Sequence, residues 1–505
     1  METRSAGILL PITSLPSRYG IGTMGREARK FIDFLEKAGQ SWWQILPLGP
    51  TGYGDSPYQS FSTFAGNPYL IDLDDLAKEG YLKPSEYRKI SWGDDPKRVD
   101  YGLLYEKRFG VLRKAAERLE LNPPADYASF LKKNAFWLED YALFMAEKYE
   151  HGGISYQEWE EPLRLHEEKT IQKERIRLKE EVSFWSALQY LFFHQYSSMK
   201  KYANAHGIGI IGDVPIYVSP DSSDIWANPE LFQLGKDRRP KMVAGVPGDA
   251  FTPDGQLWGN PLYDWKKMKE DGYAWWTERI RYQSNLVDLL RIDHFRGFES
   301  YFAIPAEDQN ARRGEWKKGP GIEFFRTVEK KLGKLNLIAE DLGFLTPEVI
   351  QMVKDTGYPG MKVLQFAFDP RDTGGGYLPH QYPRNCVVYA GTHDNDTIMG
   401  WVHSAPKPFV KRAEKYLHLD EKEGYNWGVL RGAYESVASL AVMQFQDILG
   451  LGSEGRINTP STVGGNWTWR CEEGAFTGTL ARKLRSWMEL YGRLPREKKA
   501  AGSSD

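Results

Sequence analysis

The sequence predicts an α/β protein, a (β/α)8 TIM barrel, and three observations lead to this fold class. Apolar runs of strand length recur along the chain, and eight of them can be counted. Nearly every run ends in a cluster of Gly, Pro, Asp, His or Asn before a helical pattern begins. The runs are apolar on both faces, as parallel strands covered by helices should be. They are Ala6–Ile12, Trp42–Leu48, Ile208–Val214, Leu286–Ile292, Leu335–Ala339, Met361–Phe368, Cys386–Ala390 and Leu440–Phe445.

Helical patterns lie between these runs. In Arg26–Ala38 the residues Ala28, Phe31, Ile32 and Leu35 form the i, i+3, i+4 stripe that packing on a sheet requires. A second helix is expected over Pro347–Asp355, because Thr346 suits the N-cap position and proline suits the first helical turn. Strands and helices that alternate in this way eight times favour a barrel.

Two stretches between runs are too long for simple connections. Residues from about 76 to 205 show helices with polar faces, for example Ser183–Ala205, so we expect a helical subdomain beside the barrel. Residues from about 219 to 271 are rich in Gly, Pro and Trp, and loops of that length usually form lids or binding loops. We therefore expect one catalytic domain over residues 1–496 and a frayed tail over 497–505.

Composition excludes several classes of protein. The 66 basic and 68 acidic residues nearly cancel, so neither nucleic acid nor an anionic membrane is expected as a partner. A hydrophobic content of 41%, with no apolar run long enough to span a bilayer, predicts a soluble protein. Two cysteines without CxxC spacing predict neither a disulfide framework nor a zinc site, and no secretion signal is evident. These features together predict a cytoplasmic protein.

Two short motifs match a nucleotide-binding pattern without its context. Residues 20–25 read GxGxxG, but they begin well after the first strand, and the second strand ends without an acidic residue for a ribose. Residues 450–455 match as well, yet they lead into Asn458 and a proline instead of a helix. Their glycines fit a tight turn near a ligand better. No GxxxxGK[ST], GxSxG or HExxH is present, which excludes the chemistries that depend on those motifs.

Acidic residues follow three of the predicted strands, where a barrel places its active site. The fourth run leads to Arg291 and Asp293, which lie two residues apart and therefore on one face. They form either a structural ion pair or a nucleophile whose pKa the arginine lowers. The fifth run leads to Glu340 and Asp341, and periodicity leaves open which of them is a buried acid. The seventh leads to Thr392-His393-Asp394-Asn395-Asp396.

An ionised and a protonated carboxyl group about 5 Å apart form the retaining arrangement for glycosidic bonds. One carboxylate attacks the sugar carbon while the other protonates the leaving oxygen. A third carboxylate can stabilise the positively charged transition state. Three strands that end in acids, surrounded by aromatic and amide-rich loops, therefore fit sugar chemistry better than redox or phosphate chemistry.

Six longer strings resemble the amylomaltase family of 4-α-glucanotransferases, also called disproportionating enzymes, in the α-amylase clan. The resemblance runs from about Gly7 to Arg470 and implies a barrel with helical insertions and no separate C-terminal β domain. The strings are GDSPYQSFSTFAGNPYLIDL from Gly54, GDVPIYV from Gly212, GQLWGNPLYDW from Gly255, LLRIDHFRGF from Leu289, IAEDLG from Ile338 and THDNDT from Thr392.

The resemblance implies roles for individual residues. Asp293 would be the nucleophile, Glu340 the acid/base and Asp394 the transition-state stabiliser. The expected substrate is an α-1,4-glucan or maltooligosaccharide. The implied substrate-binding residues are Tyr58, which would stack on the sugar ring, Arg291, His294 and His393 around it, Phe251, Gln256 and Trp258 in a lid over the acceptor groove, and Asp213 in a supporting role.

Two other functions are compatible with the sequence. An α-glucan hydrolase of the same clan would share the three carboxylates and differ in its acceptor. A catalytically inactive glucan-binding protein would bind amylose without forming product. No cofactor and no metal-ligand set is expected, so activity should persist in a chelator.

Overall fold

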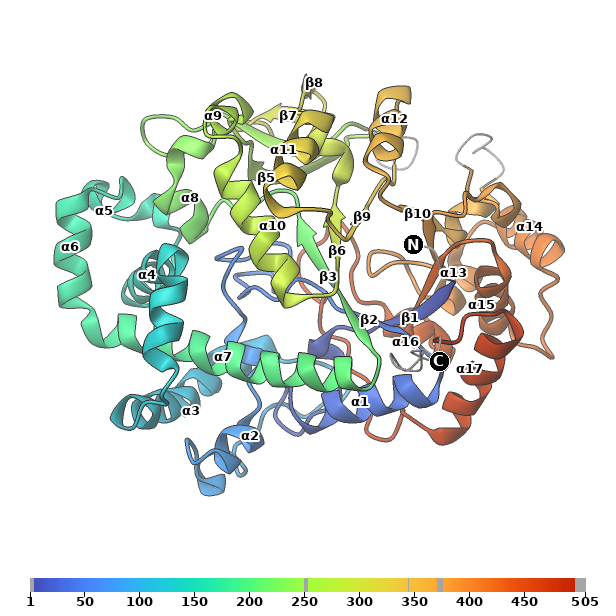
Figure 1. Cartoon of the computed structure of the whole chain (residues 1–505), viewed down its shortest axis with the longest axis horizontal. Helices are drawn as coiled ribbons and strands as arrows, with labels where there is room; N and C mark the ends of the chain where they lie inside the picture. Colours follow the sequence, from blue (N-terminus) through green and yellow to red (C-terminus); the bar gives the residue numbers. More distant parts are fainter. Residues whose placement is uncertain (1–3, 249–252, 344, 370–375, 496–505) are drawn as a thin grey trace, which may run out of the picture.

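The computed structural model describes residues 4–248, 253–343, 345–369 and 376–495, and it contains the predicted barrel (Figure 1). One parallel sheet of 8 strands runs in the order β10-β11-β12-β1-β2-β3-β6-β9. Each strand overlaps one of the eight predicted runs, which confirms the fold class. The strands are β1 Ser5–Leu9, β2 Trp42–Gln44, β3 Gly209–Pro215, β6 Leu289–Asp293, β9 Leu337–Ala339, β10 Gly360–Val363, β11 Cys386–Tyr389 and β12 Leu440–Gln444.

The two outer strands of this order, β9 and β10, meet through two contacts that bring the barrel near closure. The Ala339 N–H donates to the Pro359 carbonyl oxygen at 3.0 Å. The Asp341 carboxylate accepts the Met361 N–H at 2.6 Å. Asp341 therefore acts as a link between strands.

Helices pack outside the strands. The predicted stripe of α1, Arg26–Lys37, is fully buried, and Thr346 caps α12, Pro347–Thr356, by accepting the Val349 N–H at 3.4 Å. Of the helices in the described residues, none is long and apolar enough to cross a membrane. The other helices after the barrel strands are α10 Ala274–Leu286, α11 Ile322–Leu332, α13 Ile398–Ser404, α14 Lys407–Leu417, α15 Tyr425–Glu435, α16 Phe445–Leu449 and α17 Gly478–Leu490.

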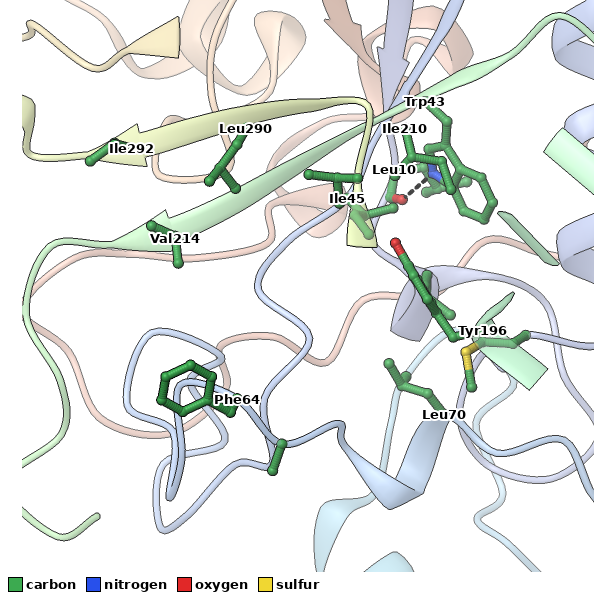
Figure 2. Close-up of a cluster of buried hydrophobic side chains, with 14 of the residues drawn as sticks. Leu10, Trp43, Ile45, Phe64, Leu70, Tyr196, Ile210, Val214, Leu290 and Ile292 are labelled. Carbon is green, nitrogen blue, oxygen red and sulfur yellow. Dashed lines mark hydrogen bonds between the residues drawn. The ribbon is translucent and has the colours of Figure 1, made fainter. Parts of the chain in front are cut away.

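Side chains alternate between the two faces of the barrel sheet, as the strand period of two requires. Figure 2 shows outward side chains of β3 and β6, including Val214, Leu290 and Ile292, in the large cluster that packs against the helices. Ile211, Leu289 and the inward residues of the other strands form a separate cluster inside the barrel. The inner face of β3 and β6 is therefore the face that carries Asp213, Arg291 and Asp293.

The stretch between β2 and β3 is largely helical, and its helices extend to one side of the barrel (Figure 1). The longest, α7, packs against α4 and α3 and also contacts β3. These helices are α2 Leu73–Lys78, α3 Tyr101–Leu121, α4 Tyr127–Glu150, α5 Glu161–Arg164, α6 Glu168–Arg177 and α7 Lys179–Ala205.

A second, antiparallel sheet was not predicted. It has 4 strands in the order β5-β4-β7-β8 and joins residues from the stretches after β3 and after β6. The first of these stretches also holds the short helices α8, Ser223–Ala227, and α9, Trp265–Glu270. Short strands interrupted by Gly and Pro give a weak periodic signal, which explains the omission. The strands are β4 Met242–Val246, β5 Gln256–Pro261, β7 Ser300–Pro305 and β8 Glu315–Lys318.

Candidate active site

A buried charge network occupies the carboxyl ends of β3 and β6. Asp213 pairs with Arg291 in the parallel register of these strands, and Pro215 pairs with Asp293. Arg291 donates to Asp213 at 2.6 Å and to Asp293 at 2.9 Å, so it bridges both carboxylates. Although burial acts to lower the pKa of Arg291, the negative charges of Asp213 and Asp293 raise it well above its usual value. The arginine therefore stays charged.

Asp293 differs from the simple prediction for a carboxylate beside an arginine. Its pKa is raised to about 6, because burial outweighs the opposing effect of the Arg291 charge. The expectation that Arg291 holds this pKa below its ordinary value was therefore wrong. The side chain still keeps 30% of its surface exposed, against 0% for Asp213. Of the two carboxylates that Arg291 binds, only Asp293 is accessible to a ligand.

Glu340 follows β9 and reaches the same end of the barrel. Its carboxylate accepts the His294 N–H at 2.6 Å and the Leu342 N–H at 2.8 Å. Burial and then the nearby charge of Asp293 raise the pKa of Glu340 to about 7, against the effect of Arg291 and of these two donors. Glu340 therefore keeps a proton to a higher pH than a free glutamate does, as a general acid requires.

The structure separates Glu340 from Asp341. Ile338 belongs to the cluster inside the barrel, and strand alternation places Glu340 on the same face. The carboxylate of Asp341 lies against β10 instead, where a side chain on Gly360 would collide with it. The choice depends on which face of β9 is the inner one, and the apolar run alone does not reveal this.

A second group of side chains, Tyr58, His393 and Asp394, adjoins this charge network. The Tyr58 hydroxyl donates to Asp213 at 2.7 Å, and its ring stacks on His393 with centroids 5.0 Å apart. His393 Nε2 lies 3.4 Å from an Asp394 carboxylate oxygen. In this arrangement one face of the Tyr58 ring is covered by His393. Tyr58 thus links Asp213 to the loop that carries Asp394.

Two residues that sequence reasoning missed hold Asp394 in place. The Asn458 side chain donates to its carboxylate at 2.6 Å, and Arg456 donates to its backbone carbonyl at 2.9 Å. Trp467, also missed, packs against both Tyr58 and His393. The available signal was the turn formed by residues 450–455, which precedes this segment and follows the eighth strand.

The rings of Trp258 and His294 are in contact, and His294 lies next to Glu340. The Trp258 ring meets the His294 ring edge-on, with centroids 4.8 Å apart, and its indole N–H donates to Gln256 at 3.1 Å. Burial and the nearby Arg296 charge lower the pKa of His294 to about 3, so its imidazole is neutral. Phe251, the third predicted lid residue, lies outside the described residues.

His294 has a left-handed backbone conformation with φ of 52°. Such a conformation is uncommon for a residue with a Cβ and is found at functional sites. The backbone N–H of this residue, which directly follows Asp293, donates to Glu340. Within the described ranges, no group of three or more His, Cys, Asp and Glu side chains is placed to hold a metal ion.

The fold and the site define a class of protein: a (β/α)8-barrel enzyme whose carboxylates converge at the carboxyl ends of the strands. The family model of 4-alpha-glucanotransferases, glycoside hydrolase family 77, matches residues 10–476. The chain belongs to this 4-alpha-glucanotransferase family.

Individual relatives match this chain over almost its whole length. A 4-alpha-glucanotransferase of Clostridium butyricum is 49% identical and covers 95% of this chain and 99% of its own. One from Thermus thermophilus is 47% identical over 97% of this chain and 99% of its own. Among solved structures, an amylomaltase from Streptococcus agalactiae in complex with acarbose superposes with a TM-score of 0.95 at 43% identity, covering 97% of this chain and 100% of its own.

Proposed function

We propose that this chain transfers α-1,4-glucan segments from a donor to the 4-hydroxyl of an acceptor glucan or glucose by retaining double displacement. The observation that carries the proposal is the placement of two carboxyl groups with different surroundings at one end of the barrel. Asp293 binds Arg291 at 2.9 Å and keeps 30% of its side chain exposed, so the arginine charge favours a carboxylate that can reach a sugar. Glu340 is held by the His294 and Leu342 N–H groups, and burial together with the charge of Asp293 raises its pKa, which favours the protonated form that an acid needs. The family membership of the chain supports a glucan as the substrate.

In the first step the Asp293 carboxylate attacks the anomeric carbon of the glucose unit on the donor side of the scissile bond. Glu340 transfers its proton to the glycosidic oxygen, and the reducing-side fragment leaves with a free 4-hydroxyl. The product is a β-linked glucosyl ester of Asp293. Positive charge that develops on the sugar ring is stabilised by the Asp394 carboxylate, which Asn458 orients through its 2.6 Å hydrogen bond.

In the second step Glu340 is a carboxylate and acts as the base. It removes the proton of an acceptor 4-hydroxyl, which attacks the same carbon and releases Asp293. Two inversions give net retention. The Arg291 guanidinium stays protonated through both steps and returns Asp293 to its starting orientation.

The binding roles follow from the surroundings of these carboxylates. His393 and the neutral imidazole of His294 lie where they can contact sugar hydroxyls, and Tyr58 lines the donor side beside Asp213. Trp258 and Gln256 form the acceptor side. We propose that they order an incoming sugar and exclude water.

Incubation with maltotriose tests the reaction class and the nucleophile together. Wild type should form glucose and longer oligosaccharides at a constant number of reducing ends, and Asp293→Asn should lose at least about a thousandfold in rate. A rising number of reducing ends would point to the hydrolase instead. Amylose binding without any product in wild type would point to the inactive binding protein.

A further inference from the structure

Strand β5 carries a bulge opposite β4. Val243 pairs with Pro261 and Gly245 pairs with Leu257, so the three residues 258–260 stand opposite one residue of β4. Gly259 in the centre has φ of +79°, a conformation that favours glycine. Bulges of this kind redirect side chains and are frequent beside active sites.

The bulge sends its two side chains to different partners. Trp258 meets the His294 ring edge-on, next to the acid/base carboxyl group. Asn260 is 5% exposed, and its amide donates to the Val218 carbonyl oxygen at 2.8 Å in the segment after β3. The position of Trp258 thus depends on how firmly its neighbour Asn260 is held.

Gln59 completes this attachment from the loop after β2. Its amide donates to the Asn260 side-chain oxygen at 3.2 Å and accepts from the Asn260 side-chain nitrogen at 3.4 Å. Gln59 directly follows Tyr58, whose hydroxyl binds Asp213. The pair, called the amide clasp below, therefore connects the loop that carries Tyr58 to the strand that carries Trp258.

Both polar atoms of the Asn260 side chain are hydrogen-bonded. Its oxygen accepts one bond and its nitrogen donates two, to Val218 and Gln59. Because Asn260 is buried, the loss of a partner leaves a polar group unsatisfied and favours movement of the bulge. Movement there displaces Trp258, which lies two residues away along the strand.

We propose that Gln59 and Asn260 are positioning residues, and that their amide clasp sets the spacing between Tyr58 and Trp258 and thereby the preference for a sugar acceptor over water. The inference rests on the proposed transferase function and deepens it. The clasp acts on acceptor binding after the glucosyl enzyme has formed. Cleavage of the donor depends on Asp293 and Glu340 and should not change.

The test uses Gln59→Ala, Asn260→Asp and the double variant, with maltotriose as donor and labelled glucose as the varied acceptor. Each single variant should raise the acceptor KM about fivefold and raise the share of hydrolysis, with the rate of donor cleavage unchanged. Asn260→Asp retains the oxygen that accepts from Gln59 and loses both donated bonds. If the two residues act as one unit, the double variant adds little to either single change.

Asn134→Ala provides the matched control. Asn134 is also 5% exposed, and it bonds the Phe130 carbonyl oxygen at 2.9 Å within α4, away from the carboxylates. This variant should lower the melting temperature and leave acceptor KM and hydrolysis unchanged. A clasp variant that merely loses stability in the same manner would overturn the inference.

The outcomes separate the inference from the proposed function. If the wild-type enzyme forms no oligosaccharides longer than maltotriose, the proposed function itself is contradicted. Wild type that transfers normally, beside Gln59→Ala with unchanged acceptor KM and unchanged hydrolysis, overturns the clasp alone. Gln59 is half-buried in a loop, so its variant decides the matter even if Asn260→Asp fails to fold.

Discussion

The charge network on β3 and β6 and the bulged strand β5 hold their side chains by different physical means. Arg291 bridges two carboxylates at 2.6 and 2.9 Å on adjacent strands of the barrel, with Asp213 fully buried. Trp258 projects from a bulge that is held by hydrogen bonds of neutral side-chain amide groups, 2.8 to 3.4 Å long. In the proposed mechanism, bond breaking therefore depends on the rigid barrel, and the choice of acceptor depends on a strand that weaker contacts position.

Glu340→Gln should have the largest effect on activity, because it removes the acid that gives its proton to the glycosidic oxygen. The rate should fall by about 10² to 10⁴. In wild type, activity should fall above about pH 7 as Glu340 loses its proton, and below about pH 6 as Asp293 gains one. Because the two groups interact, the measured limits belong to the pair.

The pH profile of Glu340→Gln checks this assignment. Its alkaline limb should disappear while the acidic limb remains. A variant that keeps both limbs would show that another group is the acid, and Asp341→Asn would then be compared with it.

Arg291→Met should have the next largest effect, and this effect is on stability. Removal of the guanidinium leaves the buried carboxylate of Asp213 unpaired, which should lower the unfolding free energy by about 3 to 5 kcal/mol. Urea unfolding measures this change. Arg281→Met is the control, because Arg281 and Glu278 form an exposed pair worth at most about 1 kcal/mol. Equal losses in the two variants would contradict the special role given to the buried network.

Trp258→Ala tests the bulged strand directly. Loss of the ring should raise the acceptor KM about tenfold and shift products from longer oligosaccharides toward hydrolysis. Counting reducing ends during maltotriose turnover measures the shift. Trp316→Ala, on β8 of the same sheet, should leave the ratio of transfer to hydrolysis unchanged. If Trp258→Ala kept the wild-type ratio of transfer to hydrolysis, β5 would not determine the choice of acceptor.

Gly259→Ala should have the smallest effect. Its φ of +79° strains any residue with a Cβ, although no described atom lies within 4 Å of that Cβ. A shift of the bulge should raise the acceptor KM about threefold. Gly333→Ala, after α11, is the control, because Gly333 has a similar φ of +81° and equal space for a Cβ. Both should lose similar stability, and the KM should change for Gly259→Ala alone.

The sequence by itself determined the barrel and where its acids lie. The apolar runs stand out because most residues of the barrel strands are buried, on both faces in strands such as β3, β11 and β12, so their pattern depends on local composition. Asp293, Glu340 and Asp394 follow these runs and could be located for the same reason. The family resemblance supplied their roles, because nearby sequence does not distinguish a nucleophile from a structural carboxylate.

Tertiary structure decided everything that depends on partners distant in the chain. Asn458 is 64 positions from the Asp394 carboxylate that it orients, and Gln59 is 201 positions from Asn260. The direction of the Asp293 pKa shift depends on burial by the whole barrel end, which outweighs the adjacent arginine. The inner face of β9 and the bulge of β5 depend on strand pairing. Such effects sum over contacts in space, and the order of residues along the chain does not record them.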